Sequence, residues 1–330
     1  MAERKMEDSM EISVVVPTYN RPHDVVLCVK SIFDQTALPR EVIIIDDGDL
    51  SDDVVRQLKS FEKESVPVIL SESRGPAGTS TARNTGVQIA KGDIVLILDD
   101  DVIISEDYIE QLKRDYETLD SPNLAGIGGF DEADLREPPF AERLFNAIFL
   151  RGRKNWDINR IGIQSWTIDI ATPQKADWLS GNNASFKREV LSEYPYPHWS
   201  GGREAYEDVA IGLKLKKAGY HCIIDPELSL DHNEGEYVES PFKTGWKSGR
   251  NRVNIFFEYC DAYLFPIFIW AMLGEALRKF LAPVTDRRFG HHWKIGFGIT
   301  AGALKQIGIK ISNIKTVVGT TIRNILLSRN

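Results

Sequence analysis

Apolar runs and helical spacing alternate along the first part of the chain. Short runs rich in Val, Ile and Leu predict buried strands at 12–17, 42–45, 67–70, 94–98 and 124–127. Apolar residues at helical spacing predict helices at 22–35, 52–61, 80–90 and 106–119. This alternation predicts an α/β fold with a mostly parallel sheet and helices on both faces, in which ligands bind beyond the carboxyl ends of the strands.

The pattern becomes less regular after residue 130. An apolar helical piece at 140–150 lies in a stretch, 131–176, of the kind that forms a lid or an acceptor wall, and Arg151, Arg153 and Lys154 follow it. Helical spacing returns at 207–218, and a strand is predicted at 221–224. We therefore expect a flexible N-terminus at 1–10, one α/β domain at 11–240 and a helical, basic region at 241–330.

The C-terminal region is apolar and basic. Residues 262–274 form a run of 13 apolar or small side chains, which is shorter than the roughly 20 that span a bilayer. From 294 to 327, Ile, Val, Leu and Gly alternate with widely spaced lysines. An amphipathic segment lying on a membrane fits this composition, and so does a pair of docked helices with a solvated lysine face.

Charge is divided unevenly along the chain. The net charge is −8, yet residues 287–330 contain eight basic residues and no Asp or Glu, so residues 1–286 carry −16. An acidic body repels nucleic acid, whereas the basic tail attracts anionic lipid. We therefore expect an anionic membrane surface as a partner, with the tail as the contact, and no nucleic acid.

Cysteine usage and the first residues indicate a compartment. Cys28, Cys222 and Cys260 are widely spaced and lack a CxxC or CxxH neighbour, which argues against a disulfide framework and against a zinc site. The first ten residues are polar and do not resemble a secretory signal. Together with the tail, these features predict a cytoplasmic protein, peripheral to the inner face of the cell membrane.

Three consecutive carboxylates, Asp99, Asp100 and Asp101, follow the apolar run 94–98. Alone they could form a solvated acidic turn. Polar clusters at 18–20 and 46–48 also follow predicted strands, however, so all three clusters converge on one sheet edge. Hard oxygen ligands suit Mg²⁺ or Mn²⁺, and Mg²⁺ commonly takes one or two carboxylates plus phosphate oxygens. The chain has no GxGxxG and no GxxxxGK[ST], which argues against a dinucleotide site and a P-loop.

An ordered set of motifs resembles the family 2 glycosyltransferases of the GT-A fold, over about residues 11–235. The motifs are Val14-Val-Val-Pro-Thr-Tyr-Asn-Arg-Pro22, Ile45-Asp-Asp-Gly48, Ala82-Arg-Asn-Thr-Gly86, Gly92-Asp93 before Asp99-Asp-Asp101, Gly181-Asn-Asn-Ala-Ser-Phe-Lys-Arg188, and Glu207-Asp208. The resemblance implies a Rossmann-like three-layer fold of the nucleotide-diphospho-sugar transferases, with a C-terminal helical extension. It also implies an inverting, metal-dependent glycosyltransferase.

The resemblance assigns roles to particular residues. Asp208 would be the catalytic base and Asp101 a metal ligand, with His232 close to the Mn²⁺ or Mg²⁺ ion. The nucleotide would be bound by Pro17, Thr18, Tyr19, Asp46, Arg83, Asp99 and Asp100. The donor sugar or the acceptor would meet Trp178, Gly181, Asn182, Asn183 and Glu207. One departure from the family is Gly48-Asp49-Leu50, where Gly-Ser-Thr is usual.

The expected reaction moves a sugar from a nucleotide-diphosphate-sugar donor to a hydroxyl acceptor. A lipid-linked saccharide or a surface polysaccharide at the cytoplasmic membrane face is the expected acceptor, because of the basic apolar tail. A nucleotidyltransferase is one alternative, since such enzymes also use strand-end acids with Mg²⁺. A non-catalytic scaffold that binds sugar or membrane is the other.

Overall fold

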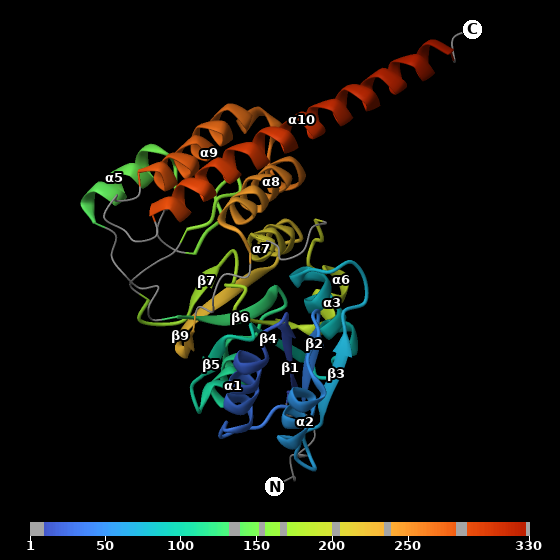
Figure 1. Cartoon of the computed structure of the whole chain (residues 1–330), viewed down its shortest axis with the longest axis vertical. Helices are drawn as coiled ribbons and strands as arrows, with labels where there is room; N and C mark the ends of the chain where they lie inside the picture. Colours follow the sequence, from blue (N-terminus) through green and yellow to red (C-terminus); the bar gives the residue numbers. More distant parts are fainter. Residues whose placement is uncertain are drawn as a thin grey trace. The chain divides into compact units, whose positions relative to one another are not determined.

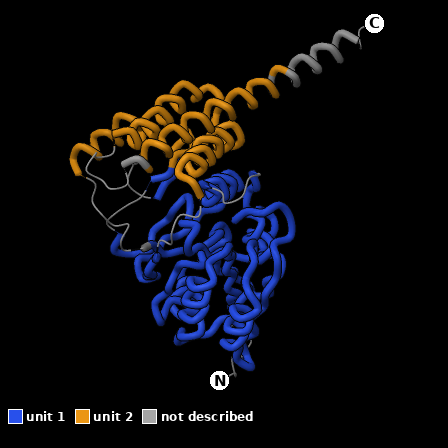
Figure 2. Tube along the Cα trace, in the orientation of Figure 1, with its two compact units in different colours: residues 1–138, 153–158, 164–236 blue, residues 139–152, 159–163, 237–330 orange. Residues whose placement is uncertain are grey.

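A computed structural model describes residues 10–131, 139–151, 156–165, 170–199, 205–233, 239–281 and 289–327. The flexible terminus expected at 1–10 lies outside this set except for Met10, and Arg153 and Lys154 also lie outside it. Contacts divide the chain into two compact units, coloured separately in Figure 2. Unit 1 comprises residues 1–138, 153–158 and 164–236, and unit 2 comprises 139–152, 159–163 and 237–330. Residues 139–152 thus group with the C-terminal helices, and the expected division into domains at 240 stays a prediction.

Unit 1 contains the sheet and its helices (Figure 1). Its strands are β1 (Ile12–Thr18), β2 (Glu41–Asp46), β3 (Val68–Glu72), β4 (Ile94–Leu98), β5 (Val102–Ile104), β6 (Leu124–Asp131), β7 (Gln174–Ala176), β8 (Asn183–Lys187) and β9 (His221–His232). Its helices are α1 (Pro22–Phe33), α2 (Asp52–Ser60), α3 (Thr79–Ile89), α4 (Tyr108–Leu119), α6 (Arg188–Glu193) and α7 (Glu207–Lys217).

The sheet is mixed. Its strand order is β3-β2-β1-β4-β8-β6-β9-β5, and β7 pairs with β9. The pairings of β1 with β2 and β4, and of β2 with β3, are parallel, as the alternating pattern predicts. In the rest of the sheet β6 and β9 are also parallel, whereas β8 runs antiparallel to β4 and β6, and β5 and β7 run antiparallel to β9.

Helices cover both faces of the sheet, which makes three layers. On one face, α1, α2 and α4 bury their apolar side chains against alternate residues of β1 and β2, such as Val14 and Ile44. On the other face α3 packs directly on β1: a Cβ added to Gly86 would lie 2.2 Å from Val15 Cγ1. Glycine in the Ala82-Arg-Asn-Thr-Gly86 motif therefore brings α3 close to the strand that leads to Thr18.

Unit 2 is helical. It contains α5 (Phe140–Ile148), α8 (Pro241–Tyr259), the 3₁₀ turn η2 (Ala262–Leu264), α9 (Phe265–Phe280) and α10 (Phe289–Leu327). Its core includes Val253 and Phe256 from α8 and Phe268 from α9. Helices α8 and α10 pack closely, since a Cβ on Gly245 would lie 2.1 Å from the carbonyl oxygen of Ile295.

The two apolar C-terminal segments form helices of unit 2. The run at 262–274 is divided between η2 and α9, with Pro266 in the first turn of α9, and the segment at 294–327 is part of the single helix α10. Among the residues that the structure describes, no helix combines the length and the apolar character that crossing a membrane requires.

Candidate active site

The ends of β1 and β2 form one side of the site in unit 1. Thr18 and Asp46 are register partners at these ends. The carboxylate of Asp46 caps its own loop, accepting the N–H groups of Gly48 and Leu50 at 2.9 Å each. It remains half-buried, and each oxygen keeps a second lone pair for a ligand. Asn20, two residues after the end of β1, has a left-handed backbone conformation with φ of 54°.

The two loops interlock through glycine. A Cβ on Gly48 would lie 2.5 Å from Asn20 Oδ1 and 2.9 Å from its backbone nitrogen. The backbone N–H of Asp47 donates to the Thr18 carbonyl at 2.9 Å, and Asp47 Oδ2 accepts from the Gly78 N–H at the same distance. The motifs at 14–22 and 45–48 therefore form one connected structure.

The acid triplet continues this edge after β4. Asp100 is buried and accepts from Thr18 Oγ1 at 2.7 Å and from Arg21 Nη1 at 3.1 Å. Arg21 also pairs with Asp101. Burial raises the pKa of Asp100 to about 6, against the lowering effect of Thr18 and Arg21. Arg21 was not singled out from the sequence, although its place between Asn20 and Pro22 in the first motif was a signal for it.

Asp101 lies beside His232. Residues 102 and 232 are partners where β5 pairs with β9, and this pairing brings His232 Nε2 to 3.3 Å from Asp101 Oδ1. Burial opposes ionisation of Asp101, but the hydrogen bond from His232 and the charge of Arg21 lower its pKa to about 2. An ionised carboxylate of this kind is a good ligand for a hard cation.

The separation of these two groups suits a metal ion. Two neighbouring ligands of an octahedral ion at about 2.1 Å lie about 3 Å apart, close to the 3.3 Å between Asp101 Oδ1 and His232 Nε2. The described residues contain no group of three or more His, Cys, Asp or Glu arranged to hold an ion. An ion held by Asp101 and His232 would therefore complete its shell with other oxygens, such as those of a diphosphate.

Arg83, which the resemblance assigns to the nucleotide, is an internal link between three segments in this structure. Only 1% of its surface is exposed. Its Nη2 donates to Asp99 Oδ1 at 2.9 Å and to the Gly181 carbonyl at 2.7 Å, while Nη1 donates to Glu207 Oε1 at 2.9 Å. Because α3 packs so closely on β1, this guanidinium faces protein acceptors. It joins the end of β4, the turn before β8 and the start of α7.

Glu207 and Asp208 begin α7 with different surroundings. Glu207 is buried and paired with Arg83, which makes it a poor contact for a sugar or acceptor. Asp208 is only partly buried, in the first turn of α7, where the helix dipole favours a negative charge. Tyr206, just before them, has a left-handed φ of 67°. Such strained residues cluster at functional sites.

The turn at 181–183 frames Asp99. The carbonyl of Asn182 accepts the Asp99 N–H at 3.0 Å, and Asn183 is fully buried at the start of β8 opposite Leu98. The side chains of Asn182 and Asn183 are therefore enclosed in this structure, and Gly181 faces Arg83 through its carbonyl. Of the other expected nucleotide contacts, Pro17 is buried within β1 and Tyr19 is half exposed.

Trp178 is a core residue. Only 2% of its surface is exposed, its ring lies 4.9 Å from that of Trp156, and its indole N–H donates to the Ser165 carbonyl at 3.3 Å. Its ring is enclosed by protein in this structure, and contact with a sugar stays a prediction. An aromatic residue next to a motif gives no sequence signal that separates these two roles.

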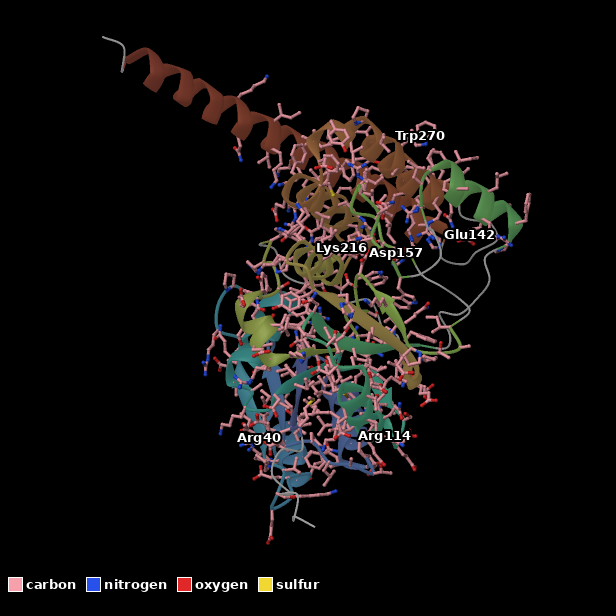
Figure 3. All side chains as sticks on the ribbon, turned by 180° about the vertical axis from the view of Figure 1, so that it is seen from behind. Arg40, Arg114, Glu142, Asp157, Lys216 and Trp270 are labelled. Atoms are coloured by element: carbon pink, nitrogen blue, oxygen red, sulfur yellow. The ribbon has the colours of Figure 1, made fainter. Side chains whose placement is uncertain are left out.

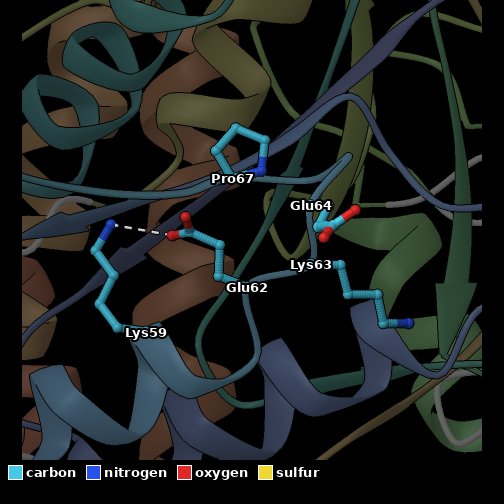
Figure 4. A pocket seen from close by; sticks show the side chains of 5 residues that line it. All are labelled: Lys59, Glu62, Lys63, Glu64 and Pro67. Carbon is cyan, nitrogen blue, oxygen red and sulfur yellow. Dashed lines mark hydrogen bonds and ion pairs between the residues drawn. The ribbon is translucent and has the colours of Figure 1, made fainter.

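A hollow elsewhere in unit 1 is lined by Lys59, Glu62, Lys63, Glu64 and Pro67 (Figure 4). It lies between α2 and the start of β3, at the amino ends of the strands. Lys59 Nζ and Glu62 Oε2 pair across it at 3.3 Å. Ligands of open α/β sheets bind at the opposite edge, where the motif residues gather.

The fold resembles that of solved glycosyltransferase structures. A mannosyltransferase structure from Pyrobaculum calidifontis, in complex with GDP-Man and Mn²⁺, matches with a TM-score of 0.56 and 17% identity over 91% of this chain and 88% of that one. At this identity the likeness shows the GT-A fold. Residues 13–193 match glycosyl transferase family 2. The chain belongs to this family and is a glycosyltransferase.

Two curated relatives extend over most of the chain. The glycosyltransferase GlyG of Streptococcus pneumoniae is 28% identical over 74% of this chain and 78% of its own length. The glucosyl-dolichyl phosphate glucuronosyltransferase of Haloferax volcanii is 25% identical over 74% of this chain and 77% of its own. Both alignments extend over more residues than the family match at 13–193.

Proposed function

We propose that this enzyme is an inverting glycosyltransferase that uses a nucleotide-diphosphate-sugar and a hydroxyl acceptor. The observation that carries the proposal is the link from Asp99 through Arg83 to Glu207. It ties the strand end that would receive the nucleotide to the start of α7, where Asp208 stands next to Glu207. The sugar donor and the general base would therefore lie next to each other at one edge of the sheet.

The nucleotide binds at the ends of β1, β2 and β4 in this proposal. Asp46 meets the base, and Asp99, which is partly exposed, meets the ribose. Asp100 acts on the nucleotide indirectly, because its two carboxylate oxygens accept hydrogen bonds from Thr18 and Arg21. Tyr19, half exposed beside them, offers a ring for the base.

Asp101 and His232 hold Mn²⁺ or Mg²⁺. The ion would neutralise charge on the departing diphosphate. Arg21, which pairs with Asp101 and Asp100, keeps the Asp101 carboxylate oriented, and the Asp101 pKa of about 2 keeps that group ionised at neutral pH. The GDP-Man and Mn²⁺ in the Pyrobaculum structure support this class of donor and cofactor.

Asp208 acts as the general base. The acceptor hydroxyl oxygen attacks C1 of the sugar from the face opposite the diphosphate, the C1–O bond to phosphate breaks, and the hydroxyl proton passes to the Asp208 carboxylate. Attack from that face inverts the configuration at C1. The start of α7 favours the ionised form of Asp208, which a base requires.

The acceptor is a lipid-linked saccharide, or a growing surface polysaccharide, at the cytoplasmic membrane face. The Haloferax relative is named for glucosyl-dolichyl phosphate, a sugar carried on a lipid, which supports this class of acceptor. The eight basic residues without acids at 287–330 support an approach to anionic lipid.

A donor screen tests the proposal. Thermal unfolding is followed with UDP-, GDP- and dTDP-sugars in the presence of Mn²⁺ or Mg²⁺, since a ligand at 100 times its dissociation constant stabilises by about 2.7 kcal/mol. The stabilising donor is then incubated with enzyme and the released nucleotide is measured. Release of the nucleoside diphosphate supports a transferase. Formation of the nucleoside triphosphate and sugar 1-phosphate when pyrophosphate is added would indicate a nucleotidyltransferase, and binding without turnover would indicate a scaffold.

A further inference from the structure

Exposed apolar side chains are concentrated in unit 2. Of the large apolar side chains that are exposed in the described parts of the chain, all except Tyr19 belong to unit 2. Domains that stay in water rarely expose contiguous apolar patches, and such patches commonly mark interaction sites. The function proposed above assigns membrane contact to the charges of the tail and leaves these side chains without a role.

Helix α5 carries the clearest part of this surface. None of its residues is buried. Phe140, Leu144 and Ile148 are 79%, 51% and 51% exposed, and their spacing of four residues places them on one side of the helix. Such a stripe usually faces a core, yet here it is exposed.

The C-terminal end of α5 is fixed to α9. The ring of Phe149 stacks on that of Trp270 with centroids 4.9 Å apart, and Trp270 Nε1 donates to the Ile148 carbonyl at 2.8 Å. Arg151, just beyond the helix, pairs with buried Glu275 at 3.0 Å. Trp270 is itself 45% exposed and Leu273 48%. We term these exposed side chains, Phe140, Leu144, Ile148, Trp270 and Leu273, the α5–α9 apolar face; Trp270 is labelled in Figure 3.

The exposed charges on the helices that carry this face indicate which kind of partner it binds. Exposed basic side chains lie on the same three helices, with Arg143 on α5, Arg278 on α9 and Lys294 on α10. On α5 the one acid is Glu142, on α9 the acid Glu275 is buried and paired, and α10 has no acid at all. In a symmetric contact with a second copy, this excess of cations over acids would meet the same excess and be repelled. An anionic bilayer accepts both the apolar side chains and the cations.

We propose that the α5–α9 apolar face inserts into the headgroup region of an anionic bilayer, with the neighbouring cations on lipid phosphates. Trp270, which has an apolar body and an indole N–H, is of the type enriched at this depth. The proposal rests on the proposed function only in that a lipid-linked acceptor requires the enzyme at a membrane. It assigns the insertion to unit 2 helices near α9, in addition to the charges of the tail.

An environment-sensitive label tests this. The full chain with Cys260→Ser receives Leu144→Cys on α5, labelled with nitrobenzoxadiazole, while Cys28 and Cys222 are buried. Arg114→Cys, at an exposed position of α4 in unit 1, is the matched control. On addition of vesicles that mix phosphatidylglycerol with phosphatidylcholine, we expect emission at position 144 to rise and shift to the blue, and emission at position 114 to stay unchanged.

A second measurement uses Phe140→Ser, Leu144→Ser and Ile148→Ser together. These side chains are exposed, so the fold should survive, which unfolding curves check. Co-sedimentation with the mixed vesicles should fall by about 10-fold or more, because the buried apolar contacts are lost. If the triple variant co-sediments as fully as the wild type and the emission of the label at 144 does not change, the proposal is overturned. Membrane attachment would then be due to the tail alone. A label shift that needs no vesicles and follows protein concentration would overturn it in favour of a second copy. Donor hydrolysis, measured without lipid, reports separately on the proposed function.

Discussion

Arg83 Nη1 lies 2.9 Å from Glu207 Oε1, and both groups are almost completely buried. The other terminal nitrogen of Arg83 is 2.9 Å from Asp99 Oδ1. Although burial opposes its charge, these two carboxylates raise the pKa of Arg83 above its usual value. One cation thus holds two carboxylates from distant parts of the chain. The position of α7, and with it Asp208, depends on that pairing.

Arg83→Met should destabilise the protein strongly. The change leaves Asp99 and Glu207 without their cation, and loss of one partner of a buried pair costs about 3–5 kcal/mol. The free energy of unfolding in urea measures this. Arg114→Met is the control, because its pair with Glu110 is exposed at 3.7 Å and such pairs contribute at most about 1 kcal/mol. Equal losses in the two variants would show that Arg83 is not a buried link.

Asp208→Asn should separate catalysis from binding. The side chain keeps its size but cannot take the acceptor proton, so turnover should fall by roughly 100-fold or more with donor affinity unchanged. Glu207→Gln is the informative neighbour, since Glu207 is held by Arg83 and should show its effect in stability. Normal turnover in the Asp208 variant, together with a lost rate in the Glu207 variant, would transfer the role of base to Glu207.

Asp101→Ala should remove metal-dependent donor binding. Asp101 is the carboxylate that lies beside His232, whereas Asp100 is turned toward Thr18 and Arg21. Titration calorimetry with the donor, with and without Mn²⁺, is the measurement. Asp100→Asn, which keeps an acceptor for Thr18, is the matched variant and should retain the Mn²⁺ dependence. If Asp101→Ala binds the donor as the wild type does, the metal lies elsewhere.

The sequence predicted local structure better than the contacts of the site. The strand at 94–98 has the bounds expected, because five apolar residues in a row are buried on both faces of the sheet. The strand β8 was missed, since Asn183-Ala-Ser-Phe-Lys187 is too polar to read as buried. Its polar side chains are enclosed because the strand lies between β4 and β6, which no local pattern reveals.

Prediction of the site from the sequence was limited in the same way, because its contacts depend on the folded chain. The motifs correctly placed Thr18 and Asp46 at neighbouring strand ends, because parallel strands present their carboxyl ends at one edge. The roles of Arg83 and Trp178 depend on how deeply their side chains are buried. That burial follows from how closely α3 and the residues around Trp156 pack, which the sequence does not reveal. The pairing of Arg21 with Asp101 joins residues 80 apart in sequence, so only the folded chain reveals it.

Stability should decrease as the pH rises above about 4. Asp115 on α4 and Asp225 on β9 are both buried. Burial, followed by the hydrogen bond and the charge of Asp225, raises the pKa of Asp115 well above its usual range. The unfolded chain loses this proton near pH 4 while the folded protein keeps it, so the free energy of unfolding falls by up to ~1.4 kcal/mol per pH unit in that window.

Asp115→Asn should flatten this pH dependence, because the amide has no proton to lose in that range. Urea unfolding at several pH values between about 4 and 8 measures the slope for each variant. Asp53→Asn is the control, since Asp53 lies on the surface of α2 with its side chain 87% exposed. An unchanged slope in the Asp115 variant would mean that this pair does not hold the proton.

Truncation after Ser312 should weaken attachment to anionic lipid without disturbing unit 2. A cut before α10 would expose α8, since a Cβ on Gly302 would lie 2.1 Å from the Trp246 carbonyl and Gln306 Nε2 donates to Asn254 Oδ1 at 2.7 Å. Beyond these contacts, Gly308 has no neighbour within 4 Å of its added Cβ. The cut after Ser312 keeps that packing and removes three basic residues, Lys315, Arg323 and Arg329.

Each basic residue near an anionic surface contributes about 1 kcal/mol, so the truncated chain should bind vesicles containing phosphatidylglycerol up to ~100-fold more weakly at low salt. Raising the salt should narrow this difference, because charges are screened over about 10 Å at 0.1 M. Neutral vesicles are the control, on which the two chains should bind alike through apolar contacts. Equal binding to the anionic vesicles would show that the end of α10 is a solvated helix and not a membrane contact.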